Sequence, residues 1–198
     1  TLKTSPKIIE TQEKIYEADA VISASGMNRR KLPLKEERKF AGRGVHYCEL
    51  CDGRAYDGKI IAVMGGGNAA VDAANFLTKY ATKLYLIHRS EFRADEVSQK
   101  KLRANDKVEI MLQTEIKALR GDKRLQEIDV FDKKTGETKT LTVDGIFVNI
   151  GVEPNTQMFK DELTLTASGR IPAGEDCRTE IAGVFAAGDA CEKEIRKM

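Results

Sequence analysis

Two cysteines in the stretch GVHYCELCDG, Cys48 and Cys51, are the residues of this sequence best suited to chemistry. A C-x-x-C pair can form half of a zinc site, a structural disulfide or a redox-active dithiol. A structural zinc needs four ligands, whereas the chain has only four cysteines and two histidines, with Cys177 and Cys191 far along the sequence. We therefore predict no metal site, and we expect His46 to be an exposed loop residue.

A redox dithiol suits this spacing because one sulfur can attack a substrate disulfide while the other resolves the mixed disulfide that forms. Asp52 directly follows the pair and is placed to give a proton to a leaving thiolate. Asp-Gly is also a common turn pair, so a turn or N-cap role for Asp52 stays open beside the chemical one. Cys177 and Cys191 are expected to be small, half-buried residues without a role.

The second chemical feature is the stretch GGGNAA, which fits the pattern G-x-G-x-x-A and lies between an apolar segment and a helical pattern. The first glycine permits a tight turn, the second lets a pyrophosphate approach the backbone, and the small alanine lets the helix pack on its strand. Amide groups at the helix start then face the phosphates. The alternative is a glycine-rich turn without a ligand. The candidate nucleotide-binding residues are Gly65, Gly67, Asn68, Ala69 and Ala70.

The stretch HRSEFRA indicates which nucleotide is bound. NAD sites usually carry an acid at this position, whereas this chain has Arg89 and Arg93. A guanidinium group pairs with a 2′-phosphate through two hydrogen bonds, so the sequence favours NADPH over NADH. The alternative is a pair of solvated surface arginines. The candidate residues here are His88, Arg89, Ser90 and Arg93.

The elements that must hold these residues follow from apolar periodicity. A strand over 60–64, a helix over 69–80 and a strand over 83–88 predict a βαβ unit. A helix over 93–103 and alternating strands within 107–145 follow, with a hairpin turn at 134–137. The fold class is therefore α/β, a Rossmann-like NAD(P)-binding domain with an antiparallel hairpin layer. Outside it we expect two strands in 7–24, the second at 20–24, and a connector over 27–44. Further strands are expected over 145–151 and 183–187, with a breaker at 153–155.

The composition is typical of a soluble globular protein, with 41% hydrophobic and 32% charged residues and a net charge of +2. Basic and acidic residues are interspersed, so we expect neither a nucleic-acid partner nor a membrane surface. No apolar run approaches the roughly 20 residues that span a bilayer. A cytoplasmic location is the default, and in that reducing compartment a C-x-x-C pair indicates redox or metal chemistry more often than a structural disulfide.

Together these motifs resemble those of the low-molecular-weight thioredoxin reductases, which are flavoprotein pyridine nucleotide-disulfide oxidoreductases. GVHYCELCDG is similar to their redox-active motif, GGGNAA and HRSEFRA to their NADPH fingerprint, and GVFAAGD to their second FAD-binding motif. The motifs occur in the family's order and at similar spacings over essentially the whole chain. The resemblance implies an NADPH-binding domain at 35–152 that carries the C-x-x-C pair, inserted between FAD-domain pieces at 1–34 and 153–198.

The resemblance also implies roles. Electrons would pass from NADPH through FAD to the cysteine pair and on to thioredoxin, with Cys51 nearer the flavin, Cys48 attacking the substrate and Asp52 donating a proton. Gly188 and Asp189 would bind FAD, the latter at its ribityl chain. Arg196 would lie near the flavin, and the full-length parent would be a homodimer.

Three departures from the family pattern change these expectations. Ser90 replaces a second arginine, which leaves the use of NADH open, and Lys197 replaces a glutamine. The family's N-terminal G-x-G-x-x-G is not in the sequence, so we expect a fragment that binds FAD poorly and turns over little by itself. The alternatives are a flavoprotein reductase partner of a peroxidase and a nicotinamide-nucleotide-binding module without catalysis.

Overall fold

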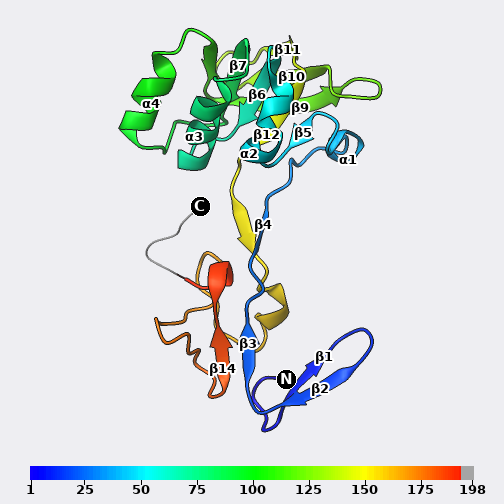
Figure 1. The fold of residues 1–198 in the computed structure, drawn as a ribbon, viewed down its shortest axis with the longest axis vertical. Coiled ribbons are helices and arrows are strands. Elements are labelled where there is room, and N and C mark those ends of the chain that lie inside the picture. The colour runs from blue at the N-terminus through cyan, green and yellow to red at the C-terminus, as the bar shows by residue number, and fades with distance from the viewer. Residues whose placement is uncertain (193–198) are drawn as a thin grey trace. The chain divides into compact units, whose positions relative to one another are not determined.

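The computed structural model describes residues 1–192 and divides the chain into two compact units. The central unit is Arg29–Gly151, and the terminal unit combines Thr1–Asn28 with the chain from Val152 onward. In Figure 1 the colour of the central unit runs from blue through cyan and green to yellow, and the terminal unit is drawn in blue for its first segment and in yellow to red for its second. The domain boundaries predicted after residues 34 and 152 separate an NADPH-binding domain from FAD-domain pieces, and this division by cofactor stays a prediction.

The central unit is built on a five-stranded sheet whose neighbouring strands are all parallel. Its strands in spatial order are β5 (Val45–His46), β12 (Gly145–Val148), β6 (Ile60–Met64), β7 (Lys83–Ile87) and β8 (Val108–Met111). The chain leaves β6 toward β7 and β8 on one side and later returns to β12 on the other. The carboxyl end of β6 is therefore a topological switch point, where nucleotides bind in open α/β sheets. The predicted βαβ unit and α/β class are confirmed.

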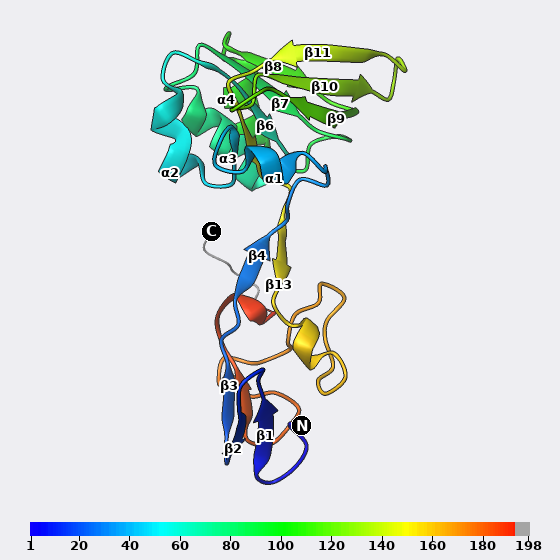
Figure 2. The ribbon, with the colours of Figure 1, turned by 90° about the vertical axis from the view of Figure 1, so that its right-hand side faces the viewer.

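Two further layers cover this sheet, as Figure 2 shows. Helices α3 (Asn68–Leu77) and α4 (Glu96–Arg103) pack on one face. On the other lies an antiparallel layer of β9 (Thr114–Arg120), β10 (Glu127–Asp132) and β11 (Thr138–Thr142). The predicted hairpin turn between β10 and β11 is confirmed, whereas the segment 107–113, which we placed among the alternating strands, supplies β8 of the parallel sheet.

Alternating side chains on the central strands build both cores of this unit. Ile61 and Val63 of β6 face the helices, and Ala62 between them faces the antiparallel layer. These three residues are fully buried. Each large aliphatic side chain buried in this way contributes about 2 kcal/mol, so burial on both faces stabilises the sheet.

The segment predicted as a connector over 27–44 is more ordered than expected. It contains β4 (Met27–Arg29) and a short helix, α1 (Glu37–Phe40). The hydroxyl of Tyr47 donates to the buried carboxylate of Glu37 at 2.8 Å and accepts from the Leu32 amide at 3.2 Å. Burial and the Glu37 carboxylate raise the pKa of Tyr47 to about 12. This contact ties the connecting segment to the residue before Cys48.

The terminal unit consists of two-stranded pairs around a small core. The hairpin β1 (Lys7–Glu10) and β2 (Ile15–Ala18) is antiparallel, while β3 (Val21–Ser23) and β14 (Val184–Ala186) are parallel. β4 pairs with β13 (Val152–Pro154). The remaining elements are the 3-10 turns η2 (Gln157–Phe159) and η3 (Gly188–Ala190).

Two predictions for this part of the chain were wrong. The segment 7–24 holds a third strand, β2, and the breaker predicted at 153–155 falls largely within β13. Proline is tolerated there because Pro154 is the last residue of a two-stranded ribbon, where a missing amide hydrogen costs little.

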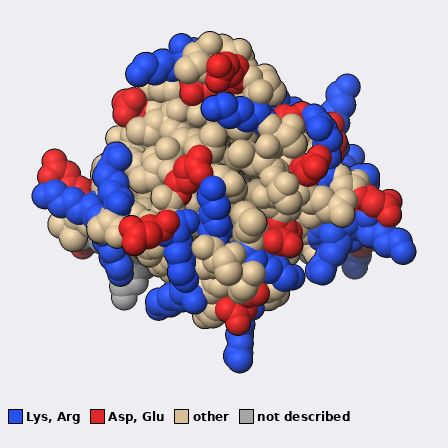
Figure 3. All heavy atoms as spheres, turned by 90° about the horizontal axis from the view of Figure 1, so that it is seen from above, with Lys and Arg blue, Asp and Glu red and all other residues tan. Residues whose placement is uncertain are grey.

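Within residues 1–192, no helix is both long and apolar enough to cross a membrane. On the face seen in Figure 3, Lys and Arg side chains are interspersed with Asp and Glu. Mixed charge of this kind agrees with the small net charge of the sequence.

Candidate functional site: a disulfide and a nucleotide turn on one sheet

The cysteine pair lies directly after the edge strand β5. Cys48 begins a one-turn helix, α2 (Glu49–Asp52), and its Sγ accepts a hydrogen bond from the Cys51 amide at 3.2 Å. The structure joins Cys48 and Cys51 in a disulfide, with their Cα atoms 5.3 Å apart. Cys51 is exposed and Cys48 half-buried, so the bond is within reach of a partner. Leu50, between them, is also exposed.

Behind the disulfide, three side chains form a hydrogen-bonded chain. Nδ1 of His46 is 3.1 Å from Oδ2 of Asp52, and Nε2 of His46 is 2.7 Å from the hydroxyl of Tyr56. Tyr56 belongs to η1 (Gly53–Tyr56), which continues from α2. The prediction that His46 is an exposed loop residue was wrong, because its side chain is only 10% exposed and lies on β5. Tyr56 was also missed. A histidine two residues before the C-x-x-C pair was a local signal for a role near the disulfide, although it does not reveal that the side chain is buried.

Aromatic contacts fix this chain of side chains. The His46 ring stacks on Phe147 of β12 with centroids 5.5 Å apart, and Tyr56 meets the same ring edge-on at 5.4 Å. Tyr56 is 5% exposed. Burial is the main cause that raises the pKa of Tyr56, and the Asp52 and Asp144 carboxylates add to it while Arg124 opposes it. The phenol therefore stays neutral over the physiological range.

The nucleotide turn follows β6 with the geometry that its pattern predicts. Gly65 has φ +144°, and a Cβ there would lie 2.2 Å from the Asn149 carbonyl oxygen, so only glycine fits. Gly67 precedes α3, and a Cβ on it would meet nothing within 4 Å. This open approach suits a pyrophosphate facing the start of a ten-residue helix, so the residues fit a dinucleotide. Ala69 and Ala70 open the helix, and Ala70 is fully buried against the sheet.

The Asn68 side chain has a structural partner. Its amide donates to the Asp95 carboxylate at 2.8 Å, and its carbonyl accepts from the Asp95 amide at 2.8 Å. Asp95 is the N-cap of α4, so this reciprocal pair fixes the two helices to each other. A role for Asn68 toward the nucleotide would therefore use its backbone.

The predicted 2′-phosphate residues gather at the end of β7. His88 is buried, its ring packs against Gly66, and its Nε2 is 3.1 Å from the Ser90 hydroxyl. The Arg93 amide donates to the Gly66 carbonyl at 2.8 Å, which ties this loop to the nucleotide turn. Burial first, and then the charges of Arg93 and Arg89, lower the pKa of His88. The charges of both exposed guanidinium groups therefore act on the His88 ring, which lies beside the nucleotide turn.

The disulfide and the nucleotide turn lie at the same edge of the sheet. Cys48 follows β5 and Gly65 follows β6, and carboxyl ends of parallel strands share an edge. One strand, β12, lies between them, which puts the two strand ends about 10 Å apart. Packing of η1 on α3 adds to this arrangement, since a Cβ on Gly53 would meet Leu77.

The predicted FAD residues belong to the terminal unit. Gly188, with φ +74°, and the exposed Asp189 follow the carboxyl end of β14, which suits a carboxylate that contacts a ligand hydroxyl. Arg196 lies outside the described residues. Cys177 is half-buried as predicted, whereas Cys191 is buried.

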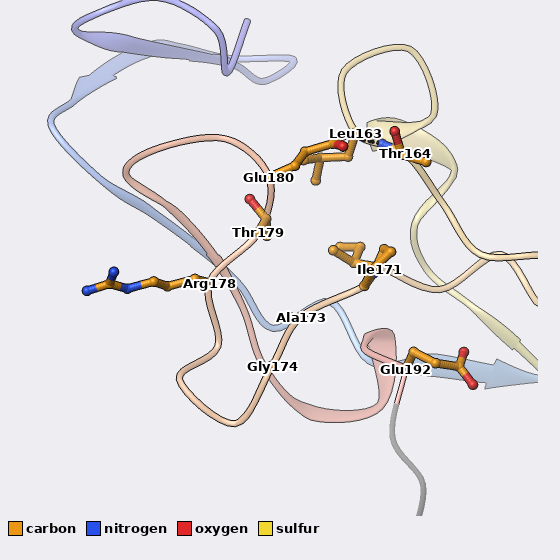
Figure 4. A pocket seen from close by; sticks show the side chains of 10 residues that line it. Leu163, Thr164, Ile171, Ala173, Gly174, Arg178, Thr179, Glu180 and Glu192 are labelled. Atoms are coloured by element: carbon orange, nitrogen blue, oxygen red, sulfur yellow. Dashed lines mark hydrogen bonds between the residues drawn. The ribbon is translucent and has the colours of Figure 1, made fainter.

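A cavity of about 470 Å³ in the terminal unit contains none of the predicted site residues. Figure 4 shows Leu163, Ile171 and Thr179 around it, with the Arg178 guanidinium pointing away. The Glu180 carboxylate, which also lines the cavity, accepts a hydrogen bond from the Thr164 amide at 2.6 Å. Among residues 1–192, no group of three or more His, Cys, Asp or Glu side chains could hold a metal ion.

A parallel sheet that carries a glycine-rich nucleotide turn and an exposed disulfide at one edge defines a nucleotide-binding disulfide protein. The chain belongs to the pyridine nucleotide-disulphide oxidoreductase family, whose model matches residues 2–198. A protein of Clostridium pasteurianum described as "34.2 kDa protein in rubredoxin operon" is 44% identical over 198 residues, all of this chain and 64% of that protein. Thioredoxin reductase of Bacillus subtilis is 33% identical over 194 residues, 97% of this chain and 61% of that protein.

Solved structures agree with this family. Lactococcus lactis thioredoxin reductase in its FR conformation superposes with a TM-score of 0.83 at 31% identity, over 96% of this chain and 63% of that one. Thioredoxin reductase of T. acidophilum superposes with a TM-score of 0.83 at 29% identity, over 98% of this chain and 65% of that one. The chain thus spans about three fifths of the length of these relatives.

Proposed function

We propose that this chain is the nucleotide-binding and dithiol part of an NADPH-dependent thioredoxin-disulfide reductase that also uses FAD. The observation that carries the proposal is the exposed Cys48–Cys51 disulfide at the same sheet edge as the Gly65–Ala70 turn. Thioredoxin reductases among the relatives and solved structures support the same function.

The residues take the following roles. The turn from Gly65 to Ala70 and the start of α3 hold the pyrophosphate, and Arg89 and Arg93 hold the 2′-phosphate. FAD, when bound, supplies the two-electron chemistry that links a nicotinamide to a disulfide. Cys48 attacks the substrate disulfide, Cys51 resolves the mixed disulfide, and Asp52 protonates the departing thiolate.

The source of electrons distinguishes this proposal from a close relative. A ferredoxin-flavin thioredoxin reductase of Clostridium acetobutylicum superposes with a TM-score of 0.51 at 32% identity. NADPH is favoured here because the Gly67 approach is open and two arginines flank His88. We infer a cytoplasmic enzyme whose partner is thioredoxin or a similar small disulfide protein and whose parent is a homodimer. A reductase partner of a peroxidase uses the same dithiol and is the second candidate.

Covalent trapping tests the dithiol's role without a bound flavin. Reduced C51S chain is mixed with a thioredoxin whose single cysteine is activated by thionitrobenzoate, and the adduct is followed on non-reducing gels. Cys48 should displace thionitrobenzoate and form a chain–thioredoxin disulfide within minutes. The C48S/C51S variant keeps only Cys177 and Cys191 and should form little adduct. Equal adduct in the two variants, together with tight NADPH binding, would favour a nucleotide-binding module without catalysis.

A further inference from the structure

His46 has no part in the function proposed above, yet its contacts are specific. Its imidazole bridges a carboxylate that follows the disulfide and a buried phenol, at 3.1 and 2.7 Å. An ionised carboxylate only accepts hydrogen bonds, so Nδ1 of His46 carries the hydrogen toward Asp52. Nε2 of the neutral ring then accepts from the Tyr56 hydroxyl. The two neighbours thus select one tautomer of His46.

The ring is also held in place. Three elements contribute, since His46 lies on β5, Tyr56 on η1 and Phe147 on β12. The Tyr56 ring is itself confined, because a Cβ on Gly145 would lie 2.4 Å from it. With one face on Phe147 and both nitrogens engaged, the imidazole has no freedom to turn away from Asp52.

A proton donor at a thiol–disulfide centre must hold a proton at working pH. Aspartic acid side chains in general lose theirs at about pH 4, whereas histidine side chains do so at about pH 6.5. A carboxylate paired with an imidazolium contains the same proton as a carboxylic acid paired with a neutral imidazole. Such a pair can therefore donate through the carboxyl oxygen near neutral pH, where few lone carboxyl groups are protonated.

We propose that His46 is a positioning residue for the Cys48–Cys51 centre, which orients Asp52 and supplies the proton that Asp52 passes to a departing thiolate. The proposal rests on the dithiol function proposed above and extends it. Its basis is the Tyr56–His46–Asp52 chain beside the disulfide.

The resolving step shows how the atoms balance. The Cys51 thiolate attacks Sγ of Cys48, the Cys48–Cys51 bond forms, and the bond from Cys48 to the substrate sulfur breaks. The substrate sulfur leaves with the electron pair and takes a proton from Asp52, which takes one from Nδ1 of the His46 imidazolium. The neutral imidazole left by this transfer carries its hydrogen on Nε2, which donates to the Tyr56 hydroxyl oxygen, and the tautomer with hydrogen on Nδ1 returns by proton exchange with water. Two electrons have then passed from the dithiol to the substrate disulfide.

The charges near this chain of side chains set its response to pH. Asp52 on α2 and the Tyr56 hydroxyl on η1 face His46 directly. Arg124 and Asp144 act on Tyr56 with opposite signs. The Asp52 carboxylate, which is 41% exposed, is therefore the charged group in contact with the imidazole among the described residues.

The test compares wild type with His46→Asn, whose amide can replace the Nδ1 hydrogen bond but cannot carry a proton. The reduced 198-residue chain is oxidised by glutathione disulfide between pH 6 and 9, and peptide mass spectrometry follows Cys48 and Cys51 separately from the other two cysteines. At pH 6.5 wild type should form the disulfide about tenfold faster than H46N, within the range of general acid catalysis. The ratio should approach one at pH 9, well above the range in which histidine side chains in general hold a second proton.

Several outcomes decide the proposal. A wild-type to H46N ratio that is the same at every pH overturns proton supply by His46. Nitrogen-15 NMR of the two histidines of the wild-type chain at pH 8 gives a second test that needs no variant. His46 with hydrogen on Nδ1 supports the pairing, and His46 with hydrogen on Nε2 overturns it. If wild-type Cys48 and Cys51 react no faster than Cys177, the dithiol function itself fails, which the pH ratio alone would not show.

Discussion

Replacing Arg89 or Arg93 with alanine should weaken NADPH binding while leaving NADH binding unchanged. Both guanidinium groups are exposed, and both lower the pKa of His88, so their fields overlap beside the nucleotide turn. A hydrogen bond to a charged group contributes about 1.5–3 kcal/mol, and exposure to solvent and salt brings this toward the lower end. Each substitution should therefore raise the Kd for NADPH about tenfold, since about 1.4 kcal/mol is a factor of ten.

Fluorescence titration of the chain with NADPH and with NADH measures both constants at two salt concentrations. The double variant should lose about 50–100-fold in NADPH affinity if the two contacts are independent. Lys139→Ala on β11 is the matched control, because it also removes one exposed positive charge and should change neither constant. Equal losses for NADH and NADPH would refute the reasoning, because NADH has no 2′-phosphate for the arginines to bind.

Three further predictions concern the turn, its histidine and the two units. Gly66→Ala puts a methyl group 2.2 Å from the His88 ring and should destabilise the chain by about 1–3 kcal/mol in thermal unfolding. The methyl group of Gly67→Ala meets nothing within 4 Å, so this variant should keep its Tm but bind NADPH more weakly in nucleotide titration. Because the folded state lowers the pKa of His88, the unfolded chain binds more protons there, so the free energy of unfolding should fall as pH drops below about 6.5. His88→Asn should remove this contribution to the pH dependence of the free energy of unfolding, measured by urea unfolding at pH 5–8. In hydrogen exchange, amides of β6, β7 and β12 should be protected far longer than those of β1, β2, β3 and β14, since two-stranded pairs are marginal and the central sheet is covered on both faces; comparable protection would contradict this.

The parts predicted well from sequence depend on local signals. The strand–turn–helix–strand from Ile60 to Ile87 combines a buried apolar run, a glycine turn and an amphipathic helix, and each is legible within a few residues. The turn between β10 and β11 is equally local.

The parts missed depend on distant partners. β5 is two residues long and is a strand only because β12, about a hundred residues later, pairs with it. That pairing brings His46 onto Phe147, so the burial of His46 has no local signal in the sequence. β13 exists in the same way through β4, which overrides the tendency of Glu153-Pro154-Asn155 to break structure. Side-chain chemistry such as the Asp52–His46–Tyr56 chain therefore depends on strand order, which residue types alone do not determine.

The spacing of the two sites bears on the proposed need for a flavin. Direct transfer between a nicotinamide and a disulfide requires reacting atoms about 3–3.5 Å apart. The strand ends that carry Gly65 and Cys48 are separated by β12 and lie about 10 Å apart. Since β12 is buried and hydrogen-bonded on both sides, this separation is fixed within the central unit. Because the two strand ends cannot approach each other, direct reaction would depend on how far the nicotinamide extends from the turn, whereas the proposed flavin would carry the two electrons between the two sites.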